Sequence, residues 1–256
     1  MPARPGADPA RALAVGDGSN DVEMIEWAGA GVVMGSAPQW VRDRVVARQG
    51  CLHPYDELPA SRLAVVVIDM QQYFTLPGYQ GECAPAREII SPINRLCEAV
   101  RAAGGTIVWV QTASDNADSF WSHHHGVMLT PERSARRLQT LRRDSPGFAL
   151  HPDLRAHDSD LRVVKRFYSA MAPGSSELEP LLRGRGVDTL LIAGTVTNVC
   201  CESTGRDAMM RDFRSIMIDD ALAAVTPAEH EHALHGWIMF FGDVLSVDEA
   251  TDRLRP

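Results

Sequence analysis

The chain has 256 residues, of which 45% are hydrophobic, and it carries a formal net charge of −8 with a sequence pI of about 5.6. This length and apolar content provide one sizeable hydrophobic core, with room for a small appendage. The acidic balance argues against nucleic acid or an anionic membrane surface as the main partner. No apolar run approaches the roughly 18 residues that a membrane-spanning helix needs.

Cysteine usage and the first residues indicate a cytoplasmic location. The five cysteines are an odd number and form no Cys-x-x-Cys pair, which fits a reducing compartment better than a disulfide framework. The first twenty residues hold only a four-residue apolar run, Ala-Leu-Ala-Val, which is too short for the hydrophobic region of a signal peptide.

Residues 1–58 differ in composition from the rest of the chain. They are rich in Gly, Ala and Pro, and they precede the first run with the pattern of a buried strand. The stretch 53–61 contains two prolines and is typical of a linker. We therefore predict an N-terminal extension and linker over 1–58 and a separate domain over 59–256.

Six short runs in the second part have the composition of β-strands. The first, Arg-Leu-Ala-Val-Val-Val-Ile-Asp at 62–69, is β-branched and apolar without alternation, as in a strand that is covered on both faces. The others follow at 106–112, 161–167, 188–195, 215–220 and 243–247. Helix-period segments lie between them, at about 85–103, 131–142, 175–184, 199–213 and 228–241. This alternation predicts an α/β fold with helices on both faces of a mostly parallel sheet.

Two helix starts can be placed from their capping residues. Pro131 and Pro227 each follow a threonine, and proline is favoured at the first helical position after such a cap.

Three polar residues follow three of the predicted strands. Asp69 ends the first strand, Lys165 ends the third, and Cys200 opens the helix after the fourth. The carboxyl ends of parallel strands meet at one edge of a sheet, where ligands of open α/β sheets bind. A carboxylate, an ammonium and a thiol at this edge would together form a nucleophilic site.

The chemistry of such a site depends on the thiol. The thiolate is the nucleophile, and an unperturbed cysteine has a pKa of roughly 8.5. A helix N-terminus and the ammonium of Lys165 both favour the thiolate, while Asp69 can accept the thiol proton and later pass it to a leaving amine. Amide groups in the turn before the helix lack helical partners and can hold an oxyanion.

Two adjacent cysteines, Cys200 and Cys201, compete for the role of nucleophile. Neighbouring helix residues point about 100° apart, so only one of the two faces the strand edge. Cys200 lies nearer the turn and shares a helix face with Thr204 and Asp207, whereas Cys201 shares a face with Ala208. We therefore predict that Cys200 is the nucleophile and that Cys201 has a packing role.

Each of these residues also has an ordinary structural explanation. A free cysteine after a strand is commonly a small buried hydrophobe, an aspartate there commonly forms a turn, and a lysine there is commonly a solvated charge. Their joint placement favours a site, but spacing alone leaves the two interpretations nearly balanced.

Two segments around the carboxylate and the ammonium resemble motifs of the isochorismatase-like cysteine hydrolases. Val-Val-Val-Ile-Asp-Met-Gln-Gln-Tyr-Phe at 65–74 resembles the first-strand motif of that family, with Asp69 at the acid/base position. Val-Val-Lys-Arg-Phe-Tyr-Ser-Ala-Met at 163–171 resembles the lysine motif, except that Met171 stands where the family usually has phenylalanine.

A third segment resembles the family's nucleophile motif. Gly-Thr-Val-Thr-Asn-Val-Cys-Cys-Glu-Ser-Thr-Gly-Arg-Asp-Ala at 194–208 carries Cys200 at the position of the nucleophile, and Cys201 stands where members usually have valine. The three motifs occur in the order of the family, and the resemblance covers about residues 60–250.

The resemblance implies a three-layer α/β/α, isochorismatase-like fold and a homodimer or homotetramer. It also implies a cis peptide between Val196 and Thr197 and an oxyanion hole formed by the amides of Thr197 and Cys200. The implied reaction is hydrolysis of a non-peptide C–N bond in a small amide or N-carbamoyl compound, through a thioester and with release of ammonia. Cys200 would attack the carbonyl, Lys165 would stabilise the charge, and water activated by Asp69 would cleave the thioester.

The same resemblance leaves alternatives open. True isochorismate hydrolases act on a vinyl ether and lack the nucleophilic cysteine, so the presence of Cys200 favours an amide. Vinyl-ether hydrolysis of an isochorismate-like acid remains the alternative within the family. A non-enzymatic binding protein on the same fold is a further alternative, with Met171 and Cys201 as signs of drift.

Metal and cofactor binding are not expected. Nicotinamidases of this family hold a metal through an Asp-x-His motif after the second strand, but here Asp115 is followed by Asn116 and Ala117. The run His123–His125 is a poor chelator because consecutive residues rarely reach one ion, and such a run on a loop is commonly solvated or substrate-facing.

Two aromatic residues are candidates for the wall of a substrate pocket, Phe74 and Trp121. Ordinary packing explains Trp121 at least as well. The stretch 113–130 is long and polar with aromatic content, as lids often are, and we expect it to select the substrate.

Residues 13–37 resemble a different family, the haloacid-dehalogenase-type phosphatases, in their last motif. Asp17 and Asp21 would there help to hold Mg²⁺, for which carboxylates are suitable ligands. The nucleophile motif of that family, Asp-x-Asp after a strand, does not precede them. We therefore expect a phosphatase-tail-like segment without catalysis and disfavour a Mg²⁺-dependent phosphatase. A docking or oligomer segment is another possibility, through the apolar stripe Met24, Ile25 and Trp27.

Overall fold

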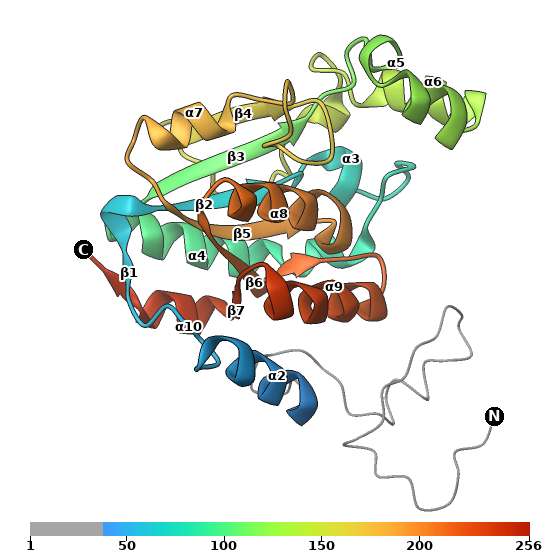
Figure 1. Cartoon of the computed structure of the whole chain (residues 1–256). Coiled ribbons are helices and arrows are strands. Elements are labelled where there is room, and N and C mark those ends of the chain that lie inside the picture. Colours follow the sequence, from blue (N-terminus) through green and yellow to red (C-terminus); the bar gives the residue numbers. More distant parts are fainter. Residues whose placement is uncertain (1–37) are drawn as a thin grey trace, which may run out of the picture.

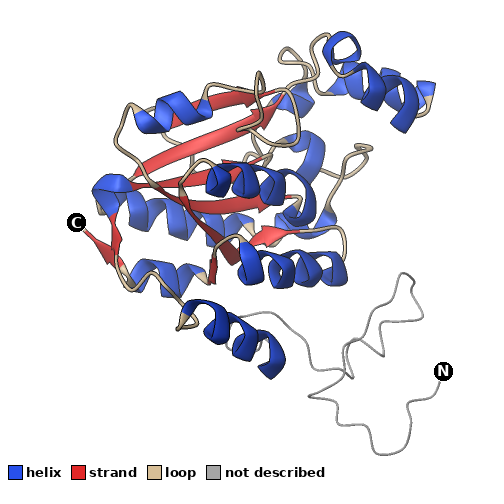
Figure 2. Ribbon diagram, viewed as in Figure 1, coloured by secondary structure: helices blue, strands red, loops and turns tan. Residues whose placement is uncertain are grey.

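The computed structural model describes residues 38–256, and its centre is a six-stranded sheet with helices on both faces (Figures 1 and 2). The strands lie in the order β4-β3-β2-β5-β6-β7, and every neighbouring pair is parallel. This confirms the predicted α/β fold class. The strands are β2 Leu63–Ile68, β3 Thr106–Thr112, β4 Leu161–Lys165, β5 Thr189–Thr195, β6 Arg214–Ala223 and β7 Asp243–Leu245.

The central strand β2 explains why the sheet needs helices on both faces. All six of its residues are buried, and all are apolar. Because side chains alternate along a strand, Ala64 and Val66 belong to one hydrophobic cluster and Val65 and Val67 belong to the cluster on the opposite face. Neither face of such a strand tolerates water, so both require cover.

Helices from both halves of the chain provide this cover (Figure 1). The first cluster takes buried residues from α7 Leu178–Arg183, α8 Glu202–Met210 and α9 Pro227–Phe240. The second takes them from α4 Ile90–Ala102 and α10 Val247–Asp252. The result is the three-layer arrangement that the family resemblance implied.

The predicted helix starts are confirmed. In α6, Pro131–Thr140, the side chain of Thr130 accepts a hydrogen bond from the amide of Arg133. In α9, Thr226 accepts from the amide of Glu229, whose carboxylate accepts in return from the Thr226 amide. Both caps satisfy helix amides that would otherwise lack partners.

The described part of the N-terminal extension packs on the core around the sheet. Helix α2, Gln39–Gln49, lies against α9 and buries Val41 and Val45 in the first cluster. The predicted linker contains the short strand β1, Leu58–Pro59, which pairs in parallel with β8, Leu254–Arg255, near the end of the chain. The domain boundary at residue 58 stays a prediction.

Seven short helical turns lie between the longer elements of the described residues. They are α3 Gln72–Thr75, α5 Ala117–Phe120, π-helical turns at His124–Met128 and Thr197–Cys201, and 3-10 turns at Ala60–Arg62, Ala84–Arg87 and Pro146–Phe148. The helix predicted at 199–213 thus starts as a π-helical turn and becomes α-helical only at Glu202. Hydrophobic periodicity did not reveal this, because a wide turn and an α-helix bury similar positions over a few residues.

Some sequence predictions lie outside the described residues. These are the segment 13–37 with Asp17 and Asp21, and the apolar stripe of Met24, Ile25 and Trp27. Within residues 38–256, no helix has the length and apolar character that a membrane crossing requires.

Candidate active site

Asp69, Lys165 and Cys200 meet at the carboxyl edge of the sheet. Asp69 directly follows β2, Lys165 is the last residue of β4, and Cys200 lies in the π-helical turn after β5. The side chains of Asp69 and Lys165 are fully buried, and Cys200 is only 6% exposed. The sheet therefore brings together three residues that lie far apart in the sequence.

The backbone at Asp69 turns the carboxylate into the site. Its φ of 55° is left-handed, a conformation that Asp tolerates better than most residues. Its amide still donates to the carbonyl of Val110 on β3 at 2.9 Å. The chain thus leaves β2 abruptly while it stays anchored to the neighbouring strand.

An ion pair and a shared hydroxyl hold the carboxylate and the ammonium. Lys165 Nζ lies 2.9 Å from Asp69 Oδ2 and donates to Thr112 Oγ1 at 2.5 Å. The Thr112 hydroxyl in turn donates to Asp69 Oδ1 at 2.8 Å. A further bond runs from Lys165 Nζ to the carbonyl of Phe167 at 3.1 Å. Each donor and acceptor fixes the next, so the ion pair has little freedom to reorient.

Lys165 is held as an ammonium. Its complete burial disfavours the charged form, but the negative charge of Asp69 and the hydrogen bond to it outweigh this effect and raise the pKa of Lys165 above its ordinary value. The Lys165 ammonium therefore stays paired with Asp69 in the buried site.

Cys200 is a thiol at rest. Its burial raises its pKa to about 12; the Lys165 ammonium opposes this rise, while the charge of Asp69 and a hydrogen bond to Asp69 add to it. This differs from the sequence-based expectation, in which Lys165 and the helix terminus favoured the thiolate. Desolvation decides the outcome, and the Asp69 carboxylate is the candidate acceptor of the thiol proton.

Cys201 has no exposed surface. It lies in the first hydrophobic cluster, and burial raises its pKa well above the ordinary value. Its amide donates to the carbonyl of Val196 at 3.3 Å. These contacts support the predicted packing role.

The predicted position of the cis peptide is wrong by one residue. The cis bond joins Thr195 and Val196, not Val196 and Thr197. A non-proline cis bond leaves no mark in the side-chain pattern, so the sequence could place it only by analogy.

The turn around Cys200 uses some of its amides and not others. The amides of Val199 and Cys201 both donate to the carbonyl of Val196, at 3.0 and 3.3 Å. They are thus committed to the turn itself. The amides of Thr197 and Cys200, predicted to form an oxyanion hole, stay candidates for that role.

Gly194 allows the turn to approach β2. Its φ is 113°, and a Cβ at this position would lie 2.1 Å from the carbonyl oxygen of Ile68. Only glycine fits a backbone approach this close. Gly194 thus sets the spacing between the strand that ends at Asp69 and the strand that leads to Cys200.

Sequence reasoning missed Thr112 and Gln71. The side chain of Gln71 donates to the carbonyls of Thr112 and Phe148, both at 3.0 Å, and accepts from the Thr112 amide at 2.7 Å. It therefore fixes the residue whose hydroxyl links Asp69 and Lys165. Thr112 could have been found, because it too is a polar residue at a strand end.

A second set of hydrogen-bonded polar side chains begins in the π-helical turn that contains Cys200. Thr197 Oγ1 lies 3.0 Å from His230 Nδ1, and His230 Nε2 lies 2.7 Å from Asp219 Oδ1. The imidazole of His230 thus bridges the Thr197 hydroxyl and the Asp219 carboxylate. These hydrogen bonds connect the turn that contains Cys200 to α9.

The two candidate pocket aromatics lie in separate clusters. Phe74 is buried with Tyr73 and Leu141. Trp121 stacks on His124 at 4.1 Å between ring centroids and meets Tyr168 edge to face at 4.8 Å. Their contact with a substrate stays a prediction.

The histidine run is not simply solvated. His124 is 9% exposed, and burial, with smaller effects of Arg137 and His125, lowers its pKa to about 4. His125 is 4% exposed, and its Nδ1 lies 2.9 Å from Ser134 Oγ. Both rings are therefore neutral packing groups at neutral pH. Within residues 38–256 no cluster of three or more His, Cys, Asp or Glu side chains suits a metal ion.

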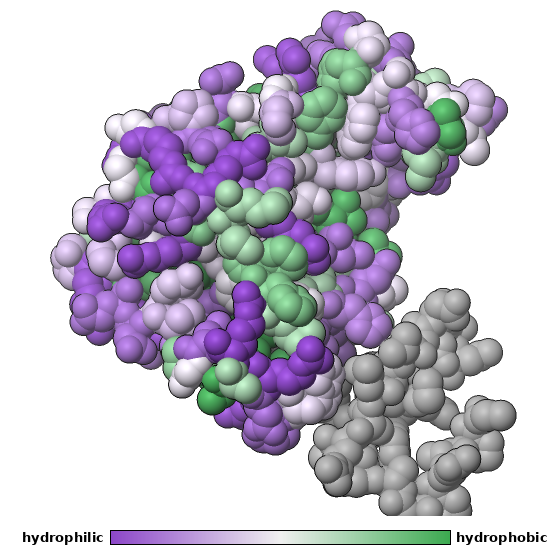
Figure 3. All heavy atoms as spheres, viewed as in Figure 1, coloured by the Kyte–Doolittle hydropathy of each residue, from purple (hydrophilic) through white to green (hydrophobic). Residues whose placement is uncertain are grey.

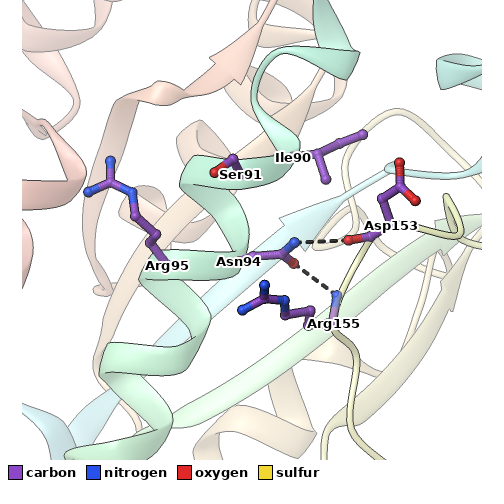
Figure 4. A pocket seen from close by; sticks show the side chains of 6 residues that line it. All are labelled: Ile90, Ser91, Asn94, Arg95, Asp153 and Arg155. Atoms are coloured by element: carbon purple, nitrogen blue, oxygen red, sulfur yellow. Dashed lines mark hydrogen bonds between the residues drawn. The ribbon is translucent and has the colours of Figure 1, made fainter.

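A separate surface hollow lies beside α4 (Figure 4). Asn94 spans it, donating to the carbonyl of Asp153 and accepting from the amide of Arg155, at 2.9 and 2.8 Å. Arg95 and Arg155 at its rim already pair with carboxylates. Its polar groups serve the fold, and it contains none of the residues of the three motifs.

Comparison with known proteins identifies the family. A model of the isochorismatase domain matches residues 63–249, and a model described as haloacid dehalogenase-like hydrolase matches residues 3–45. The ureidoacrylate amidohydrolase RutB of Pseudomonas syringae is 30% identical over 228 residues, covering 80% of this chain and 92% of that protein. Both resemblances stated from the sequence are thus confirmed.

Solved structures agree. A cysteine hydrolase from Pseudomonas syringae pv. phaseolicola is 31% identical with a TM-score of 0.68, covering 77% of this chain and 93% of that one. An isochorismatase family protein from Desulfovibrio vulgaris is 29% identical with a TM-score of 0.64, covering 75% and 97%. The chain belongs to the isochorismatase family, and it is an amidohydrolase enzyme of that family.

Proposed function

We propose that the chain hydrolyses a non-peptide C–N bond of a small N-carbamoyl compound or amide, through a thioester on Cys200, and releases ammonia. The observation that carries this proposal is the buried ion pair of Lys165 and Asp69, 2.9 Å apart, which meets the buried Cys200 at the carboxyl edge of the sheet. The name of the relative from Pseudomonas syringae, ureidoacrylate amidohydrolase, supports a ureido, that is N-carbamoyl, substrate.

The first step follows from the resting protonation states. As Cys200 Sγ bonds to the substrate carbonyl carbon, its proton passes to Asp69, so no free thiolate is needed in advance. Lys165 stays charged and offsets the negative charge that develops at the sulfur and the carbonyl oxygen. The amides of Thr197 and Cys200 are the proposed donors to that oxygen.

The second half of the reaction uses the same groups in reverse. Asp69 passes its proton to the leaving nitrogen, and ammonia departs while the acyl group stays on Cys200 as a thioester. Asp69 then takes a proton from water, and the resulting hydroxide attacks the thioester carbon. Collapse releases the acid or carbamate and returns the proton to Cys200.

Ammonia release tests the proposal. Wild type, Cys200→Ala and Cys201→Ala are assayed with a panel of small amides and N-carbamoyl compounds. We expect release by wild type and by Cys201→Ala, and none by Cys200→Ala, with unchanged circular dichroism. Ammonia from the Cys200→Ala variant would contradict the proposed nucleophile.

The alternatives predict different products. A vinyl-ether hydrolase would form pyruvate from an isochorismate-like acid instead of ammonia. A Mg²⁺-dependent phosphatase would release phosphate in an EDTA-sensitive reaction. No described residue favours either over amide hydrolysis.

We also propose self-association and a cytoplasmic location. Exposed apolar side chains on α2, α8 and α9 support a homodimer or homotetramer, and Figure 3 shows apolar groups gathered over α8 and α9. All five cysteines are free, which suits a reducing compartment. Analytical ultracentrifugation measures the oligomeric state, where a monomer at micromolar concentration would contradict this proposal.

A further inference from the structure

We infer, on the basis of the proposed function, that His230 is a positioning residue for the reaction. Held by Asp219, it fixes through Thr197 the turn that carries Cys200, and it thereby aligns the amides of that turn with the substrate oxygen. His230 lies outside all three sequence motifs of the family.

Thr197 bonds the turn to α9 through a side chain. The residue is fully buried, and its Oγ1 lies 3.0 Å from Nδ1 of His230. The next side chain of the turn, Asn198, has a buried Oδ1 without a partner among the described residues. The Thr197 hydroxyl therefore supplies a side-chain anchor that the carbonyl oxygen of its neighbour's amide group does not.

Asp219 comes from an irregular stretch of β6. The register between β5 and β6 shifts opposite this residue, since Met217 is the last to pair with β5 before the shift and Leu222 is the first after it. Irregularities of this kind redirect side chains. Asp219 is 7% exposed, and its Oδ1 lies 2.7 Å from His230 Nε2. The next carboxylate, that of Asp220, instead accepts from the first amide of α10, so the two neighbours serve opposite faces of the sheet.

Helix α9 places the imidazole between its two partners. His230 is in the first turn of this helix, and its amide donates to the carbonyl of the capping residue Thr226 at 3.2 Å. Buried Leu234 holds the same part of the helix on the core. Because the two ring nitrogens lie against Thr197 and Asp219, rotation of the ring would break both hydrogen bonds. Both nitrogens are engaged, so the role is positioning and not proton transfer to the substrate.

The alignment of the turn matters at one point of the proposed reaction. Thr197 lies three residues before Cys200 in the same turn, and the amides of these two residues are the proposed donors to the carbonyl oxygen. Such donors stabilise the transition state only when they are held in place beforehand. Alkylation of the thiol, by contrast, forms no oxyanion. Loss of the His230 contact should therefore slow acyl transfer to Cys200 and leave its alkylation unchanged.

Two reagents separate these effects without knowledge of the substrate. With p-nitrophenyl acetate, Cys200 Sγ bonds to the acetyl carbon, an oxyanion forms, and nitrophenolate leaves as the carbonyl forms again. Iodoacetamide alkylates the same sulfur and releases iodide. At pH 8, nitrophenolate release is measured with the rate of Cys200→Ala subtracted, and alkylation is followed at Cys200 by mass spectrometry. The acylation-to-alkylation ratio cancels any change in the reactivity of the thiol itself.

We expect this ratio to fall about tenfold in His230→Ala, through misalignment of the oxyanion donors. The matched control His232→Ala removes an exposed imidazole from the same helix and should keep the wild-type ratio. His230→Asn, whose amide group reaches the position of Nδ1, keeps the bond to Thr197 alone and should be intermediate. Asp219→Ala should lower the ratio, whereas Asp220→Ala should not. An unchanged ratio in His230→Ala would overturn the inference.

Thr197→Val tests whether His230 acts through the hydroxyl. This variant keeps the shape of the side chain, so it should lower the ratio about as much as His230→Ala does, and the double variant should lose no more than either one. Losses that multiply in the double variant would overturn the route through Thr197. Alkylation of Cys200 at the wild-type rate shows in each variant that the site is folded.

The outcome is separable from that of the proposed function, because p-nitrophenyl acetate is not an amide. If no compound in the panel releases ammonia but the ratio still falls in His230→Ala, the positioning role stands and the amidase proposal fails. If ammonia is released but the ratio does not change, the positioning role fails and the amidase proposal stands. Wild type that releases nitrophenolate no faster than Cys200→Ala would overturn the positioning role whatever the panel shows.

Discussion

The carboxyl edge of the sheet and the segment from residue 113 to the end of α6 differ in the burial and hydrogen bonding of their side chains. At the edge, Asp69, Thr112 and Lys165 are buried and bonded to one another. The segment after β3 has short helical turns and many exposed side chains, including Val127 and Met128 at 69% and 67%. The comparison teaches that the proposed reaction chemistry lies on buried strand ends, whereas the proposed selectivity lies on a segment whose exposed side chains the sheet does not depend on.

The largest expected effect comes from the edge. Lys165→Met leaves the buried Asp69 carboxylate without its counter-ion, which costs about 3–5 kcal/mol of unfolding free energy. We expect no ammonia release and a clear fall in the urea midpoint. Arg155→Met, which removes an exposed ion pair with Glu98, is the control and should leave the midpoint nearly unchanged. An unchanged urea midpoint in Lys165→Met would contradict the inferred cost of a buried Asp69 carboxylate without its counter-ion.

A smaller effect on activity is expected from loss of the Thr112 hydroxyl, which is bonded to both Asp69 and Lys165. Thr112→Val removes hydrogen bonds to two charged groups, each worth about 1.5–3 kcal/mol, so kcat/KM should fall about 10- to 100-fold. Thr112→Ser keeps the hydroxyl and should retain most activity. Steady-state kinetics decide between them, and equal losses in both variants would point to packing instead.

The pH dependence of the alkylation rate at Cys200 tests whether this residue is a thiol at rest. Because burial raises the pKa of Cys200 to about 12, the thiolate fraction should grow about tenfold per pH unit through pH 8–10. Alkylation by iodoacetamide, followed at Cys200 by mass spectrometry, should rise in step. A plateau near pH 8.5 would mean that the site stabilises the thiolate after all.

The smallest effect is expected from the variable segment. Trp121→Ala removes the ring that stacks on His124 and meets Tyr168, and it should change the ratio of KM values between two substrates by about tenfold. The kcat and the thermal midpoint should change little. Phe240→Ala, an exposed aromatic on α9, serves as the control. A large loss of kcat for every substrate would place Trp121 with the edge instead.

The sequence was sufficient to predict which residues lie together at the carboxyl edge of the sheet. Unbroken β-branched runs identified the sheet, and Asp69, Lys165 and Cys200 followed because parallel strands end at one edge. Thr112 obeys the same rule and was overlooked because a threonine at a strand end carries no charge to attract notice.

The remaining features depend on packing, which local patterns do not encode. The thiol state of Cys200 follows from how deeply it is buried. His230 lies 33 residues from Thr197, and nothing in the spacing connects them.

Helix α2 shows that the boundary of a sequence match and the boundary of a packed core lie at different places in this chain. Its first residues fall within the match to the haloacid dehalogenase-like model, yet Val41 and Val45 fill the hydrolase core. Arg48, a few residues on, donates to the carbonyl of Met239 and lies over the ring of Phe240. Removal of the chain up to residue 50 would therefore take away a helix that covers the core, and it would expose the apolar side chains against which Val41 and Val45 pack.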